Sequence, residues 1–136
     1  MRASSVTGPV PGPHILIADD SADMRLYVEG CLHAIGPVRV MQAADGRAAL
    51  HLARATPPAL VIAERTLPGL SGRMLCRALH ADPRTHGIPV LLISDEAPPA
   101  AAIGDGFLAK PFNAAGLQAE VERLLGRPLA PHTLLP

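Results

Sequence analysis

Short apolar runs alternate with helical patterns along the whole chain, and this alternation is typical of an α/β domain built on a parallel sheet. Between the runs, apolar residues such as Met24, Val28 and Leu32 recur at the spacing of an amphipathic helix. Pro and Gly residues separate these segments. The five predicted strands are His14–Ala18, Val38–Ala43, Leu60–Ala63, Ile88–Ile93 and Phe107–Ala109.

Four helices are predicted between and after these strands. Residues 97–104 offer at most a further short Ala-rich helix, because Pro98 and Pro99 stand near its start and glycines follow at its end. The first predicted helix ends at Gly36-Pro37, and the second begins at Asp45-Gly46 and ends before Pro57-Pro58. The third carries Met74 to Leu79 and ends at Asp82-Pro83. The last is capped by Asn113 and ends at Gly126.

A length of 136 residues suits one domain with tails. We expect a flexible N-terminal tail over residues 1–13, the domain over 14–125, and a C-terminal tail or linker over 126–136. The first 13 residues lack the apolar core of a secretory signal, and no apolar run is long enough to span a membrane. The sequence therefore predicts a cytoplasmic protein without membrane contact.

Charge and cysteine usage narrow the classes of partner. Twelve Lys and Arg balance twelve Asp and Glu, and the chain has only one Tyr, two Phe and no Trp. The sequence thus has no run of basic residues with interspersed aromatic residues, so direct nucleic-acid binding is not expected. Cys31 and Cys76 fall within apolar helical patterns without CxxC spacing, and none of the six His shows ligand spacing. We therefore predict two buried free thiols rather than a disulfide or a metal pair.

Polar residues suited to phosphate or metal chemistry follow four of the five predicted strands. They are Asp19 with Asp20, then Glu64, Ser94 and Lys110. In an open parallel sheet, the ligand crevice lies outside the carboxyl ends of the strands. We therefore expect these side chains to converge at one end of the sheet.

This set, in this order, resembles the receiver domain of two-component response regulators over roughly residues 14 to 125. The resemblance also rests on the loop Leu67–Gly72, on Phe107 three residues before Lys110, and on Lys110-Pro111-Phe112. It implies a flavodoxin-like (CheY-like), doubly wound, five-stranded parallel sheet of strand order 2-1-3-4-5.

The resemblance also implies a role for each site residue. Asp20 would be a direct Mg²⁺ ligand with Asp19 as its support, while Glu64 and the carbonyl of Thr66 would complete the protein ligands of this hard cation. Ser94 would hydrogen-bond a phosphoryl oxygen, Lys110 would pair with its charge, and Phe107 would be the switch aromatic.

Each assignment has an alternative that needs no ligand. Asp19 and Asp20 can be explained as a helix N-terminal cap cluster. Ser94 can merely begin a helix, Lys110 can be a solvated turn residue, and Phe107 can be ordinary core.

The chain departs from the family pattern at two places. Glu64 stands where the family has its phosphate-accepting Asp, and the longer side chain moves the attacking oxygen outward by about one bond length. The segment from Ser94 to Lys110 is shorter than the family habit by roughly one and a half helical turns, which predicts a shortened fourth helix. We therefore expect an altered output surface and a monomer or weak dimer.

The leading hypothesis is a non-enzymatic, atypical receiver that binds a sensor histidine kinase, a phosphotransfer protein or an output protein. A second hypothesis keeps a Mg²⁺-dependent switch that is slowly phosphorylated at Glu64. A third is a small phosphatase of the haloacid dehalogenase type, but the adjacent acids Asp19 and Asp20 do not match the Asp-x-Asp pattern of that family.

Overall fold

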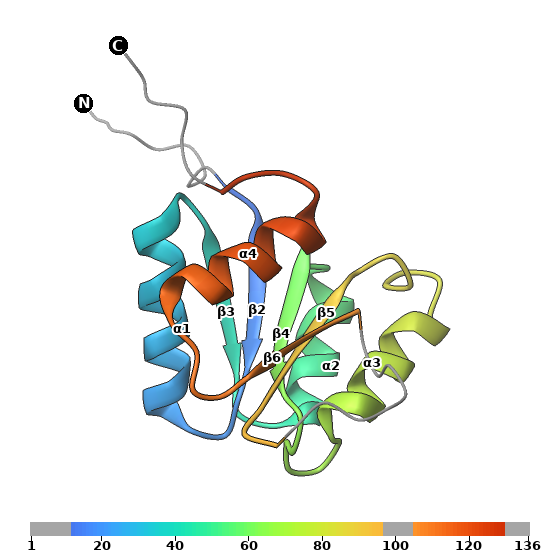
Figure 1. The fold of residues 1–136 in the computed structure, drawn as a ribbon. Coiled ribbons are helices and arrows are strands. Elements are labelled where there is room, and N and C mark those ends of the chain that lie inside the picture. Colours follow the sequence, from blue (N-terminus) through green and yellow to red (C-terminus); the bar gives the residue numbers. More distant parts are fainter. Residues whose placement is uncertain (1–11, 97–104, 130–136) are drawn as a thin grey trace, which may run out of the picture.

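Five parallel strands form a single sheet in the order β3-β2-β4-β5-β6, which is order 2-1-3-4-5 along the chain (Figure 1). The computed structural model describes residues 12–96 and 105–129. The predicted fold class is therefore confirmed. The strands are β2 (His14–Ala18), β3 (Arg39–Ala43), β4 (Leu60–Glu64), β5 (Val90–Ser94) and β6 (Gly106–Ala109).

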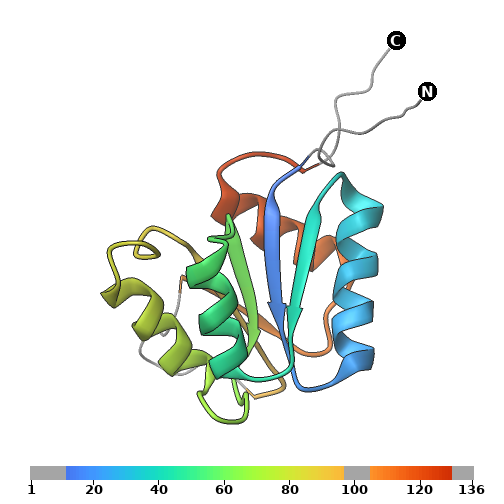
Figure 2. The same cartoon turned by 180° about the vertical axis from the view of Figure 1, so that it is seen from behind.

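The helices cover the two faces of the sheet in pairs, as Figures 1 and 2 show from opposite sides. Helices α1 (Ala22–Ile35) and α4 (Ala114–Leu125) pack on one face, and α2 (Gly46–Ala55) and α3 (Gly72–Ala81) pack on the other. None of the helices in the described ranges is long and apolar enough to cross a membrane.

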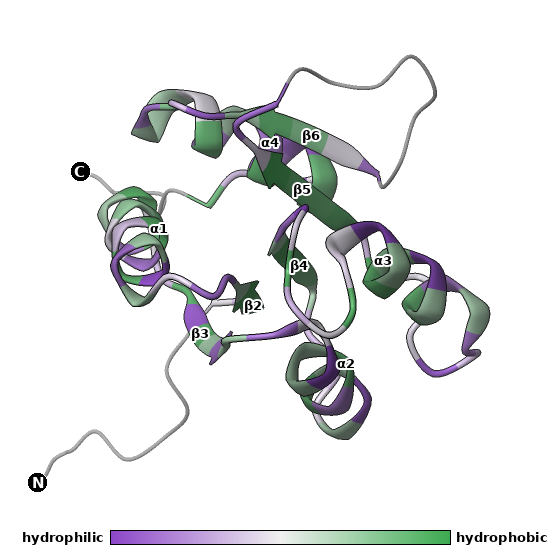
Figure 3. Ribbon diagram, turned by 90° about the horizontal axis from the view of Figure 1, so that it is seen from below, coloured by the Kyte–Doolittle hydropathy of each residue, from purple (hydrophilic) through white to green (hydrophobic). Residues whose placement is uncertain are grey.

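Two apolar clusters, one on each face of the sheet, form the core. The alternation of side chains along β2 divides it between them: Ile15 and Ile17 pack toward α1 and α4, whereas Leu16 and Ala18 pack toward α2 and α3. Every residue of β4 and β5 is buried, because helices cover both faces of these central strands. Figure 3 views the sheet from the end at which its strands finish, with β2, β4 and β5 as its apolar centre.

Side-chain caps begin each helix where the sequence places a short polar residue. The oxygens of Ser21, Asp45, Ser71 and Asn113 each accept a hydrogen bond from the backbone N–H three residues later. At the other end of α4, Gly126 adopts the left-handed conformation (φ 74°), which a glycine adopts without strain. The predicted first and last residues of α4 are therefore confirmed.

Strand boundaries differ from the prediction by one or two residues. β4 and β5 continue through Glu64 and Ser94, because Arg65 N–H still donates to Ile93 O at 2.8 Å and Lys110 N–H to Ser94 O at 2.7 Å. The two strands thus carry these polar residues within the sheet rather than on loops.

Packing also continues beyond Leu125. Leu129 is 5% exposed and joins the cluster beneath α1 and α4, and its N–H donates to the carboxylate of Glu122 at 2.7 Å. An apolar side chain after the helix stop therefore extends the packed chain to residue 129, further than the predicted limit. The short Ala-rich helix at 97–104, and with it the shortened fourth helix, lies outside the described residues.

Candidate functional site

Glu64 ends β4, and both oxygens of its carboxylate are engaged. It is only 6% exposed, because β4 is the middle strand of the sheet. Oε1 forms an ion pair with Nζ of Lys110, and Oε2 accepts from the backbone N–H and the hydroxyl of Thr66, each at 3.4 Å. The longer Glu side chain thus reaches across β5 to the residue that follows β6.

Lys110 is held at this end of the sheet by the backbone. Its N–H donates to Ser94 O at 2.7 Å, which continues the ladder between β5 and β6. Burial by itself would lower the pKa of Lys110, but the hydrogen bond and charge of Glu64, with the charges of Asp19 and Asp95, raise it above its ordinary value. The ammonium is therefore stabilised in its charged form.

Asp19 and Asp20 follow β2 next to this ion pair. The N–H of Asp19 donates to Ala43 O at 3.0 Å, and its Oδ1 accepts from Ser21 N–H at 2.8 Å. Burial raises the pKa of Asp19; the Ser21 hydrogen bond and Lys110 oppose this rise, whereas the charges of Glu64 and Asp20 add to it. The carboxylate of the buried Asp19 thus lies near those of Glu64 and the exposed Asp20.

Ser94 and Phe107 lie on the neighbouring strands with different partners. Ser94 is fully buried, and its hydroxyl accepts from Glu96 N–H at 3.0 Å. The alternative that Ser94 begins a helix concerns residues 97–104, which lie outside the described residues. Phe107 is half-buried and packs against the cluster beneath α2 and α3.

A cleft of about 490 Å³ opens beside Lys110, between α1 and the turn that follows β6. Tyr27 donates its hydroxyl proton to Phe112 O at 3.2 Å, and the two rings lie 5.7 Å apart. The lining residues are Met24, Tyr27, Asp95, Lys110, Pro111 and Phe112.

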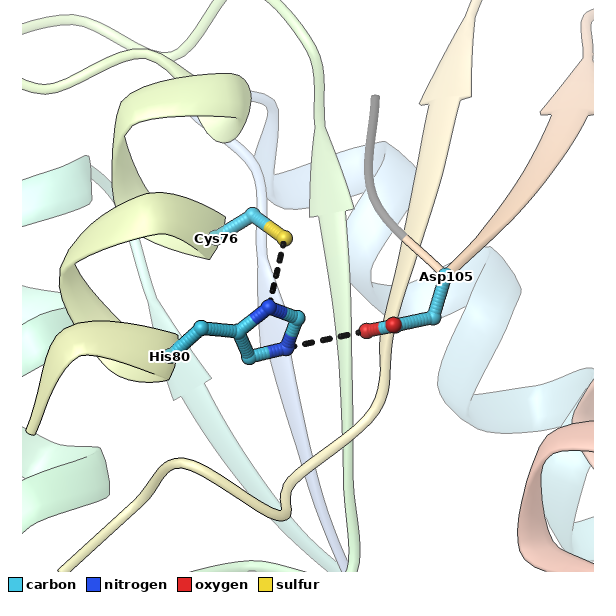
Figure 4. Close-up of side chains that lie close together, drawn as sticks. All are labelled: Cys76, His80 and Asp105. Carbon is cyan, nitrogen blue, oxygen red and sulfur yellow. Dashed lines mark hydrogen bonds and ion pairs between the residues drawn. The ribbon is translucent and has the colours of Figure 1, made fainter. Parts of the chain in front are cut away.

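The predictions for cysteine and histidine are partly wrong. Both thiols are free, but Cys31 is only half-buried. Cys76 lies beside His80, with 3.8 Å between Sγ and Nδ1, and His80 Nε2 lies 3.1 Å from Oδ2 of Asp105 (Figure 4). The four-residue spacing of Cys76 and His80 puts them on one face of a helix and was available as a signal. Asp105 joins them only through the fold.

The donor set at the carboxyl end of the sheet fits a hard cation. Asp19 and Asp20 supply carboxylate oxygens, the ligand type that Mg²⁺ prefers. Glu64 differs from them, because Lys110 and Thr66 already engage its two oxygens. A cation there would draw on Asp19 and Asp20 before Glu64.

Known proteins with similar sequences share this fold. The chemotaxis protein CheY of Pseudomonas aeruginosa is 33% identical over 119 residues, covering 83% of this chain and 96% of that relative. The receiver domain of the sensor histidine kinase PA1611 from the same species, solved with a magnesium ion in its active site cleft, superposes with a TM-score of 0.76 at 26% identity, covering 85% of this chain and 99% of that one. CheY4 of Vibrio cholerae gives a TM-score of 0.74 at 27% identity, covering 84% of this chain and 99% of that one.

The family model described as the response regulator receiver domain matches residues 15–122, nearly the whole of the described fold. Its span begins in β2 and ends in α4, so it includes all five strands and the residues at their carboxyl ends. The chain belongs to the response regulator receiver domain family.

Proposed function

We propose that this domain is an atypical receiver that acts as a protein-interaction module of two-component signalling, with Glu64 in place of the phosphate-accepting Asp. The observation that carries the proposal is the ion pair between Glu64 and Lys110. In a phosphorylated receiver, the resemblance assigns Lys110 to the phosphoryl group. Here the protein's own carboxylate already occupies that lysine.

The same contact argues against efficient phosphate turnover. A carboxylate oxygen that attacks phosphorus must lie in line with the leaving group while cations neutralise the phosphoryl oxygens. Both oxygens of Glu64 hold hydrogen-bond donors, and the extra methylene displaces them from where an Asp would put them. Misplacement on the order of 1 Å can cost ~100-fold in rate.

Glu64 would imitate the phosphorylated state only in part. Its single negative charge replaces the roughly −1.5 to −2 of a phosphoryl group, and it offers two acceptor oxygens instead of three. The Glu64 carboxylate accepts from Lys110 and Thr66, whereas within the described residues the Ser94 hydroxyl accepts from Glu96 N–H, so this contact does not include Ser94. A partner that recognises the position of Lys110 would therefore bind more readily than one that recognises a rearranged Ser94.

The acidic cluster favours the second candidate function, a slow Mg²⁺-dependent switch at Glu64. The charges of Glu64 and Asp20 repel the buried carboxylate of Asp19, and a cation beyond Lys110 would relieve this repulsion. Asp19 and Asp20 would hold Mg²⁺, as the magnesium-bound receiver of PA1611 suggests. The ion, when bound, would neutralise charge on a transferred phosphoryl group.

The surface beside the site supports a protein partner. Tyr27, at the cleft next to Lys110, is 46% exposed, and its neighbour Leu26 is 65% exposed. Burying Tyr27 against a partner would give a contact area next to the ion pair, and Leu26 would extend it along the helix. The partner would be a sensor histidine kinase, a phosphotransfer protein or an output protein, and the domain would act by binding rather than as an enzyme.

Intact-mass measurement after incubation with Mg²⁺ and acetyl phosphate tests the proposal. Glu64→Asp is the matched control, because it restores the family residue on the same backbone. We expect a phosphoryl adduct on Glu64→Asp and none on the parent protein.

Each other outcome has a definite meaning. An adduct on both proteins, lost in a Glu64→Gln variant, would replace the proposal by the slow switch. An adduct on neither would show that the rest of the site, and not only Glu64, has lost the chemistry.

A further inference from the structure

We propose that Cys76, His80 and Asp105 form a second metal site, distinct from the acidic end of the sheet, for a borderline transition-metal cation such as Zn²⁺. One ligand atom from each residue lies within 4.8 Å of those of the other two. Cys76 and His80 project from α3, and Asp105 directly precedes β6 (Figure 4). Thiolate, imidazole and carboxylate are the three protein ligand types of zinc, and hard cations avoid sulfur.

The spacing of the two α3 ligands needs little adjustment. Cys76 and His80 lie one helical turn apart on the same face, with 3.8 Å between Sγ and Nδ1. A tetrahedral zinc with bonds of about 2.3 Å to sulfur and about 2.0 Å to nitrogen holds those atoms roughly 3.5 Å apart. Small side-chain rotations therefore bring this pair to ligand geometry.

Hydrogen bonds orient the imidazole for binding through Nδ1. Its Nε2 lies 3.2 Å from Ile88 O and 3.1 Å from Asp105 Oδ2, both acceptors, so Nε2 carries the proton. Nδ1 then presents its lone pair to Cys76. Metal-binding histidines generally donate their other N–H to a carbonyl or carboxylate in this way, which fixes the ring.

The backbone of Val90 holds Asp105 beside His80. Its Oδ2 accepts from Val90 N–H at 2.8 Å, and its own N–H donates to Val90 O at 3.0 Å. Among the described residues none donates to Oδ1. When a metal binds between Sγ and Nδ1, the Asp105 carboxylate leaves Nε2 and turns toward the ion, Nε2–H keeps its hydrogen bond to Ile88 O, and a water completes the four ligands.

The environment of Cys76 makes it a poor candidate for a reactive thiol. Cys76 is 4% exposed, and burial, reinforced by the charge of Asp105, raises the pKa of its thiol to about 11. Such a thiol stays protonated at neutral pH and is a poor nucleophile. A metal ion would displace its proton and bind the thiolate.

The position of the cluster separates it from the receiver site. Asp105 pairs with Val90 at the start of β5, whereas Glu64, Ser94 and Lys110 lie at the strand ends. Four residue steps along β5 put roughly 13 Å between the two ends. A bound ion would tie α3 to the start of β5 and β6 and would stabilise that edge of the sheet.

The first test measures the melting temperature and cobalt absorption of the untagged, chelator-stripped protein. A concentration of Zn²⁺ about 100-fold above its Kd should raise the melting temperature by roughly 9 °C by mass action. Co²⁺, which prefers the same ligands, should give the intense near-ultraviolet band of a thiolate-to-cobalt charge transfer. Both effects should disappear in Cys76→Ser.

Three control variants make the assignment specific. Cys31→Ser removes the other thiol, and Asp20→Asn weakens the acidic end of the sheet; both should keep the zinc shift and the cobalt band. His80→Gln, at a half-exposed position, should weaken zinc binding by about tenfold or more and serves if Cys76→Ser fails to fold.

Loss of the band in Cys31→Ser, or its survival in both Cys76→Ser and His80→Gln, would overturn the proposal. Absence of a band and of a zinc shift in the parent protein would do the same. In that case, the three side chains would be only a hydrogen-bonded link between α3 and the sheet.

Discussion

Lys110 and Glu64 form the most buried ion pair in the described part of the chain. Removing the charge of Lys110 should lower the free energy of unfolding more than removing the charge of Glu64. Lys110→Met deletes the ammonium and keeps most of the stem, which leaves Glu64, with 7% side-chain exposure, beside Asp19. Breaking a fully buried pair costs about 3–5 kcal/mol. Because 22% of the Lys110 side chain is exposed, solvent screening reduces this to about 2 kcal/mol, or roughly 7 °C in melting temperature.

Glu64→Gln should cost less, about 1 kcal/mol or below, because Lys110 keeps Asp19 as a counter-charge and one repelling carboxylate disappears. Urea denaturation in the presence of a chelator gives the two free energies of unfolding. Arg123→Met, which opens the exposed pair with Glu120, is the control and should change stability less than Lys110→Met. The reasoning is refuted if Glu64→Gln destabilises the protein as much as Lys110→Met does.

Two further predictions concern the acidic pair. Burial raises the pKa of Asp19 from 3.8, so the folded protein holds a proton that the unfolded chain has lost, and stability should fall as the pH rises from 3.8 through the raised value. At about pH 7, the urea midpoint of Asp19→Asn should therefore be higher than that of the parent protein, and at about pH 3 the two midpoints should be equal. Equal midpoints at both pH values would contradict this prediction. Mg²⁺ at about ten times its Kd should stabilise the parent by about 1.4 kcal/mol, and Asp20→Asn should abolish the shift in melting temperature; an undiminished shift would place the ion elsewhere.

Local patterns along the chain were enough to predict the sheet and its helices. Continuous apolar runs identify strands that are buried on both faces, and short polar residues such as Ser21 and Asn113 identify helix starts, because both signals depend on near neighbours. The strand order followed from the family resemblance, whose residues at the strand ends lie where parallel topology brings them together. Boundaries at Glu64 and Ser94 were missed by one residue, since a strand ends where its ladder hydrogen bonds end.

The sequence by itself therefore determined the α/β fold and the family, both of which depend on residue types in order. Only the tertiary structure decided which atoms meet. The Glu64 carboxylate turns to Lys110 and Thr66 rather than to Ser94, and Asp105 comes to lie against His80 across 25 residues of chain. Such contacts depend on side-chain rotamers and on the packing of α3 and β6 against β5, and neither can be predicted from neighbouring residues in the sequence.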